Sequence, residues 1–381
     1  MLYKYVESLF EAQKEIIDAY LSEEPEEEED KNPAQLRSTN PRTNPALLPP
    51  GADVSSKKGS NVGIVPSKIM GHLTNVDEPI QGHNVETPFF WHVPKSGGTT
   101  FQRLHWCMGS TIANEVGVDP KFGVTSGPLS KLVAFSPWKD NPGKVVNVDV
   151  CSRGGILRAK ARGFLTKEGQ PLVDFVSTSE FQFASQMLFN ERHKARMFAL
   201  FRHPIDREVS KFYYLQKATW EPTYNTRWAE MSLEEWASRD RGDNNWMVRN
   251  LIGKSDSHDL TYDDLEIAKG IIRNKFVVGL MEQFEESVHR FNLLLGIDES
   301  DPQNQQCVEQ FLNNGGDSHS KRNSDKIAKK NAWNSYEHPE AARGSPAWVS
   351  LAKIHMYDNL LYRFIAELFD EQQTLFQTAV S

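Results

Sequence analysis

The chain has few of the features that mark membrane-anchored or secreted proteins. Its 381 residues contain no run of about eighteen apolar residues, so we expect no transmembrane helix. The first seven residues lack the apolar core of a signal peptide. No Asn-x-Ser/Thr acceptor for N-glycosylation occurs. Together these absences favour a cytoplasmic protein.

Cysteine is also scarce. Three cysteines are too few for a disulfide framework. Cys107 and Cys151 are able to pair in an oxidising compartment, but the composition favours buried free thiols. No cluster of His and Cys has the spacing of zinc ligands, so no metal site is predicted.

The net negative charge of the chain comes from its first thirty residues. Residues 1–30 contain eleven acidic residues and two lysines, so they carry −9 of a total formal charge of −8. The remaining 351 residues are therefore close to neutral. A near-neutral body argues against a nucleic-acid partner, which is normally bound through a basic surface.

Three regions follow from composition and periodicity. Residues 1–22 have apolar positions at helical spacing and predict a short amphipathic helix, and the acidic, Pro-rich residues 23–60 predict a disordered linker. We expect one folded domain over 61–381, in which strands alternate with helices. This alternation predicts an α/β fold with a mostly parallel sheet covered by helices on both faces. The expected strands are 88–93, 145–150, 173–178, 196–201 and 276–281. The expected helices are 99–108, 154–162, 181–190, 205–218, 232–238, 263–273, 283–295 and 346–370.

The most informative motif is Val93-Pro94-Lys95-Ser96-Gly97-Gly98-Thr99-Thr100, between an expected strand and an expected helix. Backbone N–H groups at a helix N-terminus bind anions, and glycines let the backbone approach a phosphate closely. The lysine adds a positive charge, and the threonines add hydroxyl donors. The order differs from the Walker motif, in which the lysine follows the glycines. An ordinary lysine-bearing turn is the alternative interpretation.

A second motif follows about a hundred residues later. Arg202 ends an apolar strand, Pro204 begins the next helix, and Ser210 lies about two helical turns further on. An arginine and a hydroxyl are suited to holding a phosphate monoester. The alternative is a strand-end arginine in a salt bridge and a solvent-facing serine.

These two motifs resemble those of sulfotransferases that use 3′-phosphoadenosine 5′-phosphosulfate (PAPS). Within that group, the sequence resembles most the carbohydrate branch related to heparan sulfate 2-O- and 6-O-sulfotransferases. The resemblance covers roughly residues 85 to 372. The resemblance implies a P-loop-like three-layer fold and transfer of a sulfuryl group from PAPS to a hydroxyl, without a metal. It also implies a glycan acceptor, although a small alcohol or metabolite fits the near-neutral body equally well.

The resemblance further implies roles for individual residues. Lys95, with Ser96, Gly97, Gly98, Thr99 and Thr100, would bind the 5′-phosphosulfate and stabilise the leaving phosphate. Arg202 and Ser210 would bind the 3′-phosphate. Glu180 is the candidate general base, where several relatives carry His, and its alternative is a helix-capping role. His105 is the second candidate base, with a core histidine as its alternative.

Further residues have weaker support. Sulfotransferases close a basic loop over PAPS late in the chain, which implies Lys321 and Arg322, although a solvated basic face explains them equally well. Arg249 is a candidate for the acceptor side. Enzymes of this branch usually lie in the Golgi lumen behind an anchor, so a Golgi location is the alternative to the cytoplasm if an anchor is missing from this sequence.

Two other functions stay open. A P-loop kinase-like enzyme would need the Walker order and a Mg²⁺-binding aspartate. A non-catalytic nucleotide-binding protein is compatible with the absence of the usual histidine and with the acidic N-terminal region, which is able to recruit a basic partner. The sequence gives no indication of the oligomeric state.

Overall fold

The structure is a computed structural model of the chain. It describes residues 69–82, 85–124, 131–165, 173–221, 224–239, 244–313 and 339–377. These lie in one compact unit, Val65–Ser381. The predicted N-terminal helix and acidic linker, 1–22 and 23–60, lie outside the described residues. No helix in the described part of the chain is long and apolar enough to cross a membrane.

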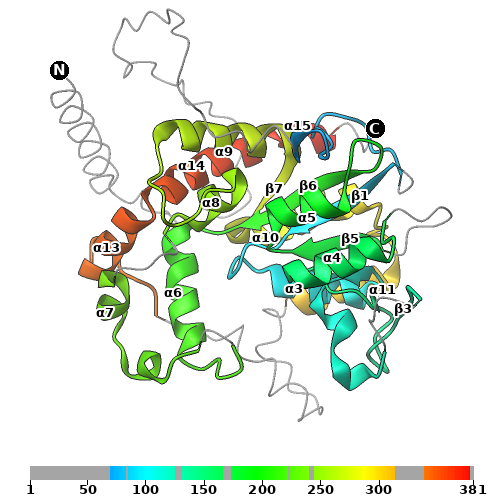
Figure 1. The fold of residues 1–381 in the computed structure, drawn as a ribbon, viewed down its shortest axis with the longest axis horizontal. Helices are drawn as coiled ribbons and strands as arrows, with labels where there is room; N and C mark the ends of the chain where they lie inside the picture. Colours follow the sequence, from blue (N-terminus) through cyan, green and yellow to red (C-terminus); the bar gives the residue numbers. More distant parts are fainter. Residues whose placement is uncertain are drawn as a thin grey trace, which may run out of the picture. The chain divides into compact units, whose positions relative to one another are not determined.

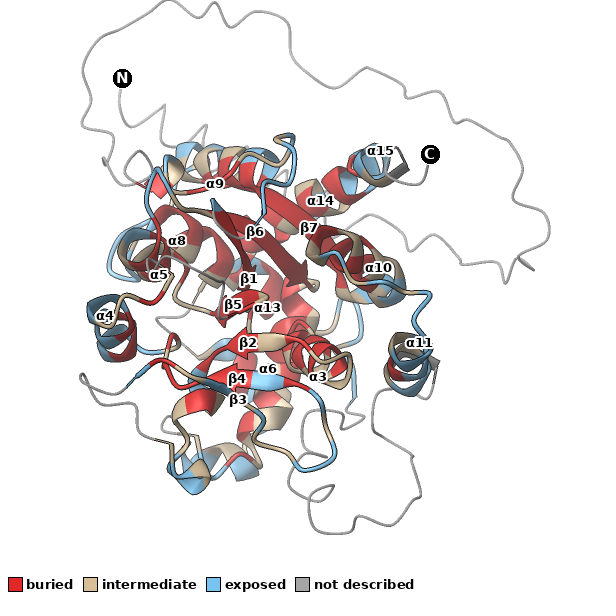
Figure 2. Ribbon diagram, turned by 90° about the vertical axis from the view of Figure 1, so that its right-hand side faces the viewer, coloured by how far each residue is buried: buried red, intermediate tan, exposed pale blue. Residues whose placement is uncertain are grey.

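The centre of the fold is a seven-stranded sheet (Figure 1). Its strand order is β3-β4-β2-β5-β1-β6-β7 (Figure 2). Its pairs are parallel except β3–β4, which is antiparallel. The α/β class and the mostly parallel sheet are therefore confirmed. The strands are β1 (Glu86–Trp91), β2 (Thr111–Ala113), β3 (Ala134–Phe135), β4 (Lys144–Val146), β5 (Phe175–Thr178), β6 (Lys194–Phe201) and β7 (Phe276–Leu280).

Short and long helices connect the strands. The α-helices are α3 (Gly98–Cys107), α4 (Arg153–Ala161), α5 (Phe181–Leu188), α6 (Pro204–Leu215), α7 (Leu233–Ser238), α8 (Trp246–Ile252), α9 (Tyr262–Lys275), α10 (Phe284–Leu295), α11 (Pro302–Val308), α13 (Pro346–Ile354), α14 (Met356–Glu371) and α15 (Gln373–Gln377). The 3₁₀ turns are η1 (Glu115–Val118), η2 (Pro120–Phe122), η3 (Thr226–Glu230) and η4 (Met281–Gln283), and η5 (Glu309–Asn313) is a π-helical turn.

The central strands are buried on both faces (Figure 2). Successive side chains of a strand point to opposite faces of the sheet, so one strand contributes side chains to two hydrophobic cores. In β6, Met197, Ala199 and Phe201 join one hydrophobic cluster, whereas Phe198 and Leu200 join the other. The first cluster includes α5, α8, α9 and α14, and the second includes α3 and α10. Helices therefore cover both faces, as the alternation of expected strands and helices predicted.

The expectation that the cysteines are free thiols is wrong for Cys107, and the alternative pairing of Cys107 with Cys151 is not formed either. Cys107, at the end of α3, forms a disulfide with Cys307 in α11, 200 residues away in the chain. Cys151 is the free cysteine. Sequence spacing gave no reason to join α3 to α11, because only the packing of both helices in the second cluster brings these two thiols together.

Candidate functional site

The loop between β1 and α3 lies at the centre of the sheet. β1 pairs with β5 on one side and with β6 on the other, so the carboxyl ends of all three strands share one edge. In open parallel sheets, ligands bind at this edge, where connections leave in opposite directions. The loop is therefore placed where the fold favours a binding site.

The loop is tightly packed. Lys95 and Gly97 have positive φ angles, 65° and 83°, and such a φ is uncommon for a residue with a side chain. A Cβ on Gly97 would lie 2.5 Å from the sulfur of Met281, and a Cβ on Gly98 would lie 2.6 Å from His92 Nε2. Both glycines are therefore required for this conformation.

The N-terminus of α3 has donors for an anion. No side chain caps this ten-residue helix, so a cap does not occupy the N–H groups of its first turn, Gly98 to Thr100. The Ser96 hydroxyl is fully buried and has no hydrogen-bond partner among the described residues. A buried polar group normally has a partner, so this orphaned hydroxyl fits a ligand in the loop.

Lys95 lies in a partly apolar environment. Its ammonium is 4.2 Å from the centre of the Tyr214 ring, which is a cation–π contact. The Tyr214 hydroxyl donates to Glu221. Burial, followed by the charge of Arg202, lowers the pKa of Lys95 to about 8, while Glu221 acts in the opposite direction. The lysine is therefore still mostly protonated at pH 7 but easily neutralised above it.

Arg202 lies beside the loop. It directly follows β6, and its Nη1 donates to the Lys95 carbonyl at 3.4 Å. His203 caps α6, and Ser210, in that helix, is 8% exposed. The two predicted phosphate-binding motifs are thus adjacent at one sheet edge because β1 and β6 are neighbours.

Glu180 follows β5 at the same edge of the sheet. Its side chain is 34% exposed, and one carboxylate oxygen lies 3.4 Å from Arg153 Nε. The carboxylate does not cap α5. The backbone N–H of Glu180 donates to the Thr178 hydroxyl. The alternative capping role is therefore not adopted, and the role of base stays a prediction.

His105 does not suit the role of a base. Its side chain is completely buried, and its ring centre lies 4.2 Å from that of Phe101 and 5.5 Å from that of Phe175. Burial lowers its pKa to about 3. A ring without exposed surface cannot receive a proton from a bound acceptor, so the core-histidine alternative applies. Lys321 and Arg322 lie outside the described residues.

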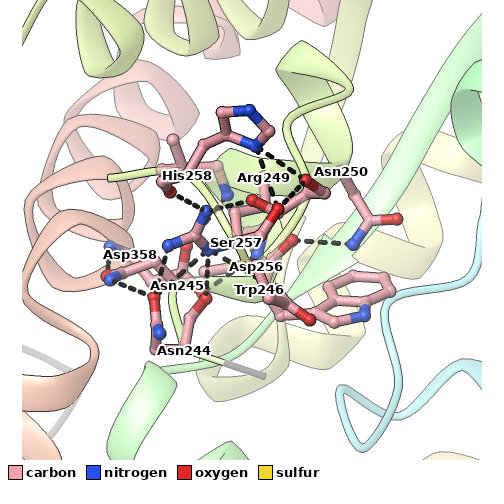
Figure 3. A network of polar contacts seen from close by, with 12 residues as sticks. Asn244, Asn245, Trp246, Arg249, Asn250, Asp256, Ser257, His258 and Asp358 are labelled. Atoms are coloured by element: carbon pink, nitrogen blue, oxygen red, sulfur yellow. Dashed lines mark hydrogen bonds and ion pairs between the residues drawn. The ribbon is translucent and has the colours of Figure 1, made fainter. Parts of the chain in front are cut away.

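The contacts of Arg249 do not fit its predicted place on the acceptor side. It is 7% exposed, and its guanidinium donates to the carbonyls of Asn244, Ser255 and His258 (Figure 3). The guanidinium also donates to Asn244 Oδ1 at 2.8 Å and lies 3.6 Å from a carboxylate oxygen of Asp256. Arg249 therefore fixes the loop after α8 and has no surface for an acceptor.

The same region joins α8 to α14. Asn245 Oδ1 accepts from the N–H groups of Tyr357 and Asp358, and the Asp358 carboxylate accepts from those of Met247 and Val248 (Figure 3). Each helix thus receives its N-terminal cap from the other. This reciprocal capping is structural and lies outside the loop site.

A cavity of about 940 Å³ borders the loop. Met281 and Phe284, which line it, are also the side chains that a Cβ on Gly97 would meet. Five carboxylates face this cavity and disfavour a phosphate there. They are Glu282, Glu285, Glu286, Glu299 and Glu309. The loop is therefore better suited to an anion than this cavity is.

Sequence reasoning missed several residues around the loop. Tyr214 contacts Lys95, and Glu282 accepts from the His203 N–H and from the Tyr362 hydroxyl. Each contact joins segments far apart in the chain. The one local indication was the position of Tyr214 on the helix that follows Arg202.

Comparison with known proteins adds no family. No protein-family model matches the chain. A search of curated proteins also gives no match. In the described part of the chain, no group of three or more His, Cys, Asp or Glu side chains is arranged to hold a metal.

Proposed function

We propose that this protein is a PAPS-dependent sulfotransferase with a P-loop-like fold. The observation that carries the proposal is that Arg202, from the second motif, donates to the carbonyl of Lys95 in the first motif, in the loop that leads into the uncapped N-terminus of α3. A helix N-terminus with a lysine and an arginine favours a ligand with more than one anionic group. PAPS has such groups at its 5′ and 3′ positions.

In this proposal each residue has a distinct task. Lys95 and the first-turn N–H groups bind the 5′ side, and Arg202 with Ser210 binds the 3′-phosphate. In sulfuryl transfer, the acceptor hydroxyl oxygen forms a bond to sulfur, and the bond from sulfur to the 5′-phosphate oxygen breaks. Glu180 takes the hydroxyl proton, while Lys95 stabilises the negative charge on the departing phosphate.

The disulfide bears on the compartment of the proposed enzyme. Disulfides persist in oxidising compartments and are rare in the cytoplasm. The Cys107–Cys307 bond therefore favours a lumenal location, the alternative considered from the sequence, over the cytoplasmic expectation. The acceptor would be a hydroxyl on a glycan or on a small molecule.

Calorimetry with adenosine 3′,5′-bisphosphate, the desulfated product of PAPS, tests this function. We expect tight binding that weakens when adenosine 5′-phosphate, which lacks the 3′-phosphate, is used instead. Preference for ATP with Mg²⁺ would favour the kinase-like alternative. Binding of the bisphosphate without sulfate transfer to any hydroxyl acceptor would favour the non-catalytic alternative.

A further inference from the structure

A chain of buried amides leads from the end of β2 to the loop. The Val116 N–H donates to Asn114 Oδ1 at 3.0 Å, and Asn114 Nδ2 donates to Gln102 Oε1 at 2.8 Å. A backbone N–H can only donate, so it fixes which Asn114 atom is the oxygen. The orientation of Asn114 in turn fixes that of Gln102.

The orientation of the Gln102 amide determines which nitrogen of His92 carries the proton. Gln102 Nε2 donates to the Ser177 hydroxyl at 2.9 Å and contacts His92 Nδ1 at 3.4 Å. Because an amide nitrogen can only donate a hydrogen bond, Nδ1 of His92 must accept it. A neutral imidazole whose Nδ1 accepts carries its proton on Nε2.

The surroundings of His92 keep its ring neutral. Burial and, to a smaller extent, the charge of Lys95 lower the pKa of His92, against an opposing effect of Glu115. A second proton would also have to sit on Nδ1, where it would face the Gln102 amide protons. The ring therefore remains the Nε2–H tautomer at neutral pH.

The Nε2–H group lies at the anion loop. His92 directly follows β1, and its ring packs where a Cβ on Gly98 would lie, next to the first N–H groups of α3. Among the described residues, no side chain or carbonyl accepts a hydrogen bond from His92 Nε2. This donor is thus available beside the N–H groups that would bind the anion.

We infer that His92 is a further anion-binding residue, whose Nε2–H donates to the 5′ group of the ligand held by the loop. Gln102 and Asn114 are positioning residues that set its tautomer. The inference rests on the proposed function for the identity of the ligand. It also excludes His92 as the base, since its Nε2 already carries a proton.

Binding of adenosine 3′,5′-bisphosphate to three variants tests the inference. His92→Leu removes the donor and should weaken binding about ten- to a hundredfold, the usual effect of losing a hydrogen bond to a charged group. His92→Gln keeps an N–H donor near the same place and should stay within about threefold of wild type. His258→Gln, at an exposed histidine away from the loop, is the control and should bind as wild type does.

Gln102→Glu gives a readout that a purely structural role would not change. A carboxylate at position 102 would accept a hydrogen bond from His92 Nδ1–H and so favour the tautomer whose proton is on Nδ1. In that variant, His92 Nε2 is an acceptor at pH 8 and carries a proton only when the ring is charged. We expect weaker binding of the bisphosphate at pH 8, with a recovery at pH 6 that exceeds the about twofold gain expected for wild type from the titration of Lys95. Long-range ¹H–¹⁵N NMR should show Nε2–H in wild type and a raised His92 pKa in the variant.

The outcomes separate this inference from the proposed function. If wild type fails to bind the bisphosphate, both are overturned. If wild type binds and His92→Leu binds equally well, only the role of His92 is overturned. A wild-type ring that carries its proton on Nδ1 overturns the inference independently of any ligand.

Discussion

The low pKa of Lys95 predicts that binding of adenosine 3′,5′-bisphosphate weakens as the pH rises above 8. Burial of the ammonium and repulsion by Arg202 place the pKa of Lys95 at about 8, well below that of an ordinary lysine. A lysine with a lowered pKa is charged below that value and loses its charge as the pH rises through it. Anion binding requires the charged form, so affinity is retained at pH 7 and lost above pH 8.

The expected size of this effect follows from the titration. With a pKa of about 8, roughly nine-tenths of the molecules carry the Lys95 charge at pH 7 and roughly one-tenth at pH 9. If only the charged form binds, affinity falls about tenfold between these two values. The phosphates contribute little, because with a second pKa of about 6 they are already about nine-tenths ionised at pH 7. The pKa of His92 is lowered and that of Tyr214 is raised, so neither group titrates in this interval.

Calorimetry at constant ionic strength, in steps from pH 7 to pH 9, measures this loss. Lys95→Met keeps the length of the side chain without its charge, so its affinity should be low and independent of pH. Lys217→Met, a change at a lysine outside the loop, should keep the wild-type pH profile. A flat wild-type profile, or a Lys95→Met profile that still falls with pH, would refute the assignment of Lys95 as the group that contacts the anion.

Three further predictions concern other parts of the site and the fold. Arg202→Lys keeps the charge but loses the planar pair of donors, so calorimetry should show about tenfold weaker binding of the bisphosphate and unchanged binding of adenosine 5′-phosphate. Glu180→Gln should bind the bisphosphate normally but transfer radiolabelled sulfate at least about a hundredfold more slowly, and unchanged transfer would exclude Glu180 as the base. Breaking the Cys107–Cys307 disulfide with Cys307→Ser should lower the free energy of unfolding by about 2–5 kcal/mol in urea titrations. Cys151→Ser should leave it nearly unchanged, and equal losses in both variants would contradict the structural role of the disulfide.

The main elements of the fold were predictable because they depend on local sequence. The apolar runs at 88–93 and 196–201 correspond to β1 and β6, which are buried on both faces. Strands β2 and β3 have only three and two residues, too few for a pattern to show. The single helix expected over 346–370 is divided into α13 and α14 at His355. This break depends on Asn245, which caps α14 from more than a hundred residues away.

The site was predictable to the same limited extent. The loop around Lys95 and the strand end at Arg202 were found because each motif is contiguous. Their proximity depends on the pairing of β1 with β6, which the sequence does not specify. The amide chain to His92 joins Asn114, Gln102 and Ser177 across the sheet edge, so no periodicity or spacing identifies it.

The arginine within β6 and the arginine that directly follows this strand differ in their ion pairing. Arg196, near the start of β6, pairs with Glu86 of β1 at 2.8 Å, and both side chains are 5% exposed. A buried cation on these two strands is thus neutralised by a carboxylate, as burial of a charge demands. Arg202, at the opposite end, makes no ion pair with a carboxylate in the part of the chain that the structure describes, and instead its guanidinium approaches the Lys95 carbonyl. The strand-end salt bridge considered as its alternative is therefore not formed within that part. Lys95 and Arg202 repel each other, which contributes to the lowered pKa of Lys95, and the proposed ligand with two phosphate groups would reduce this repulsion.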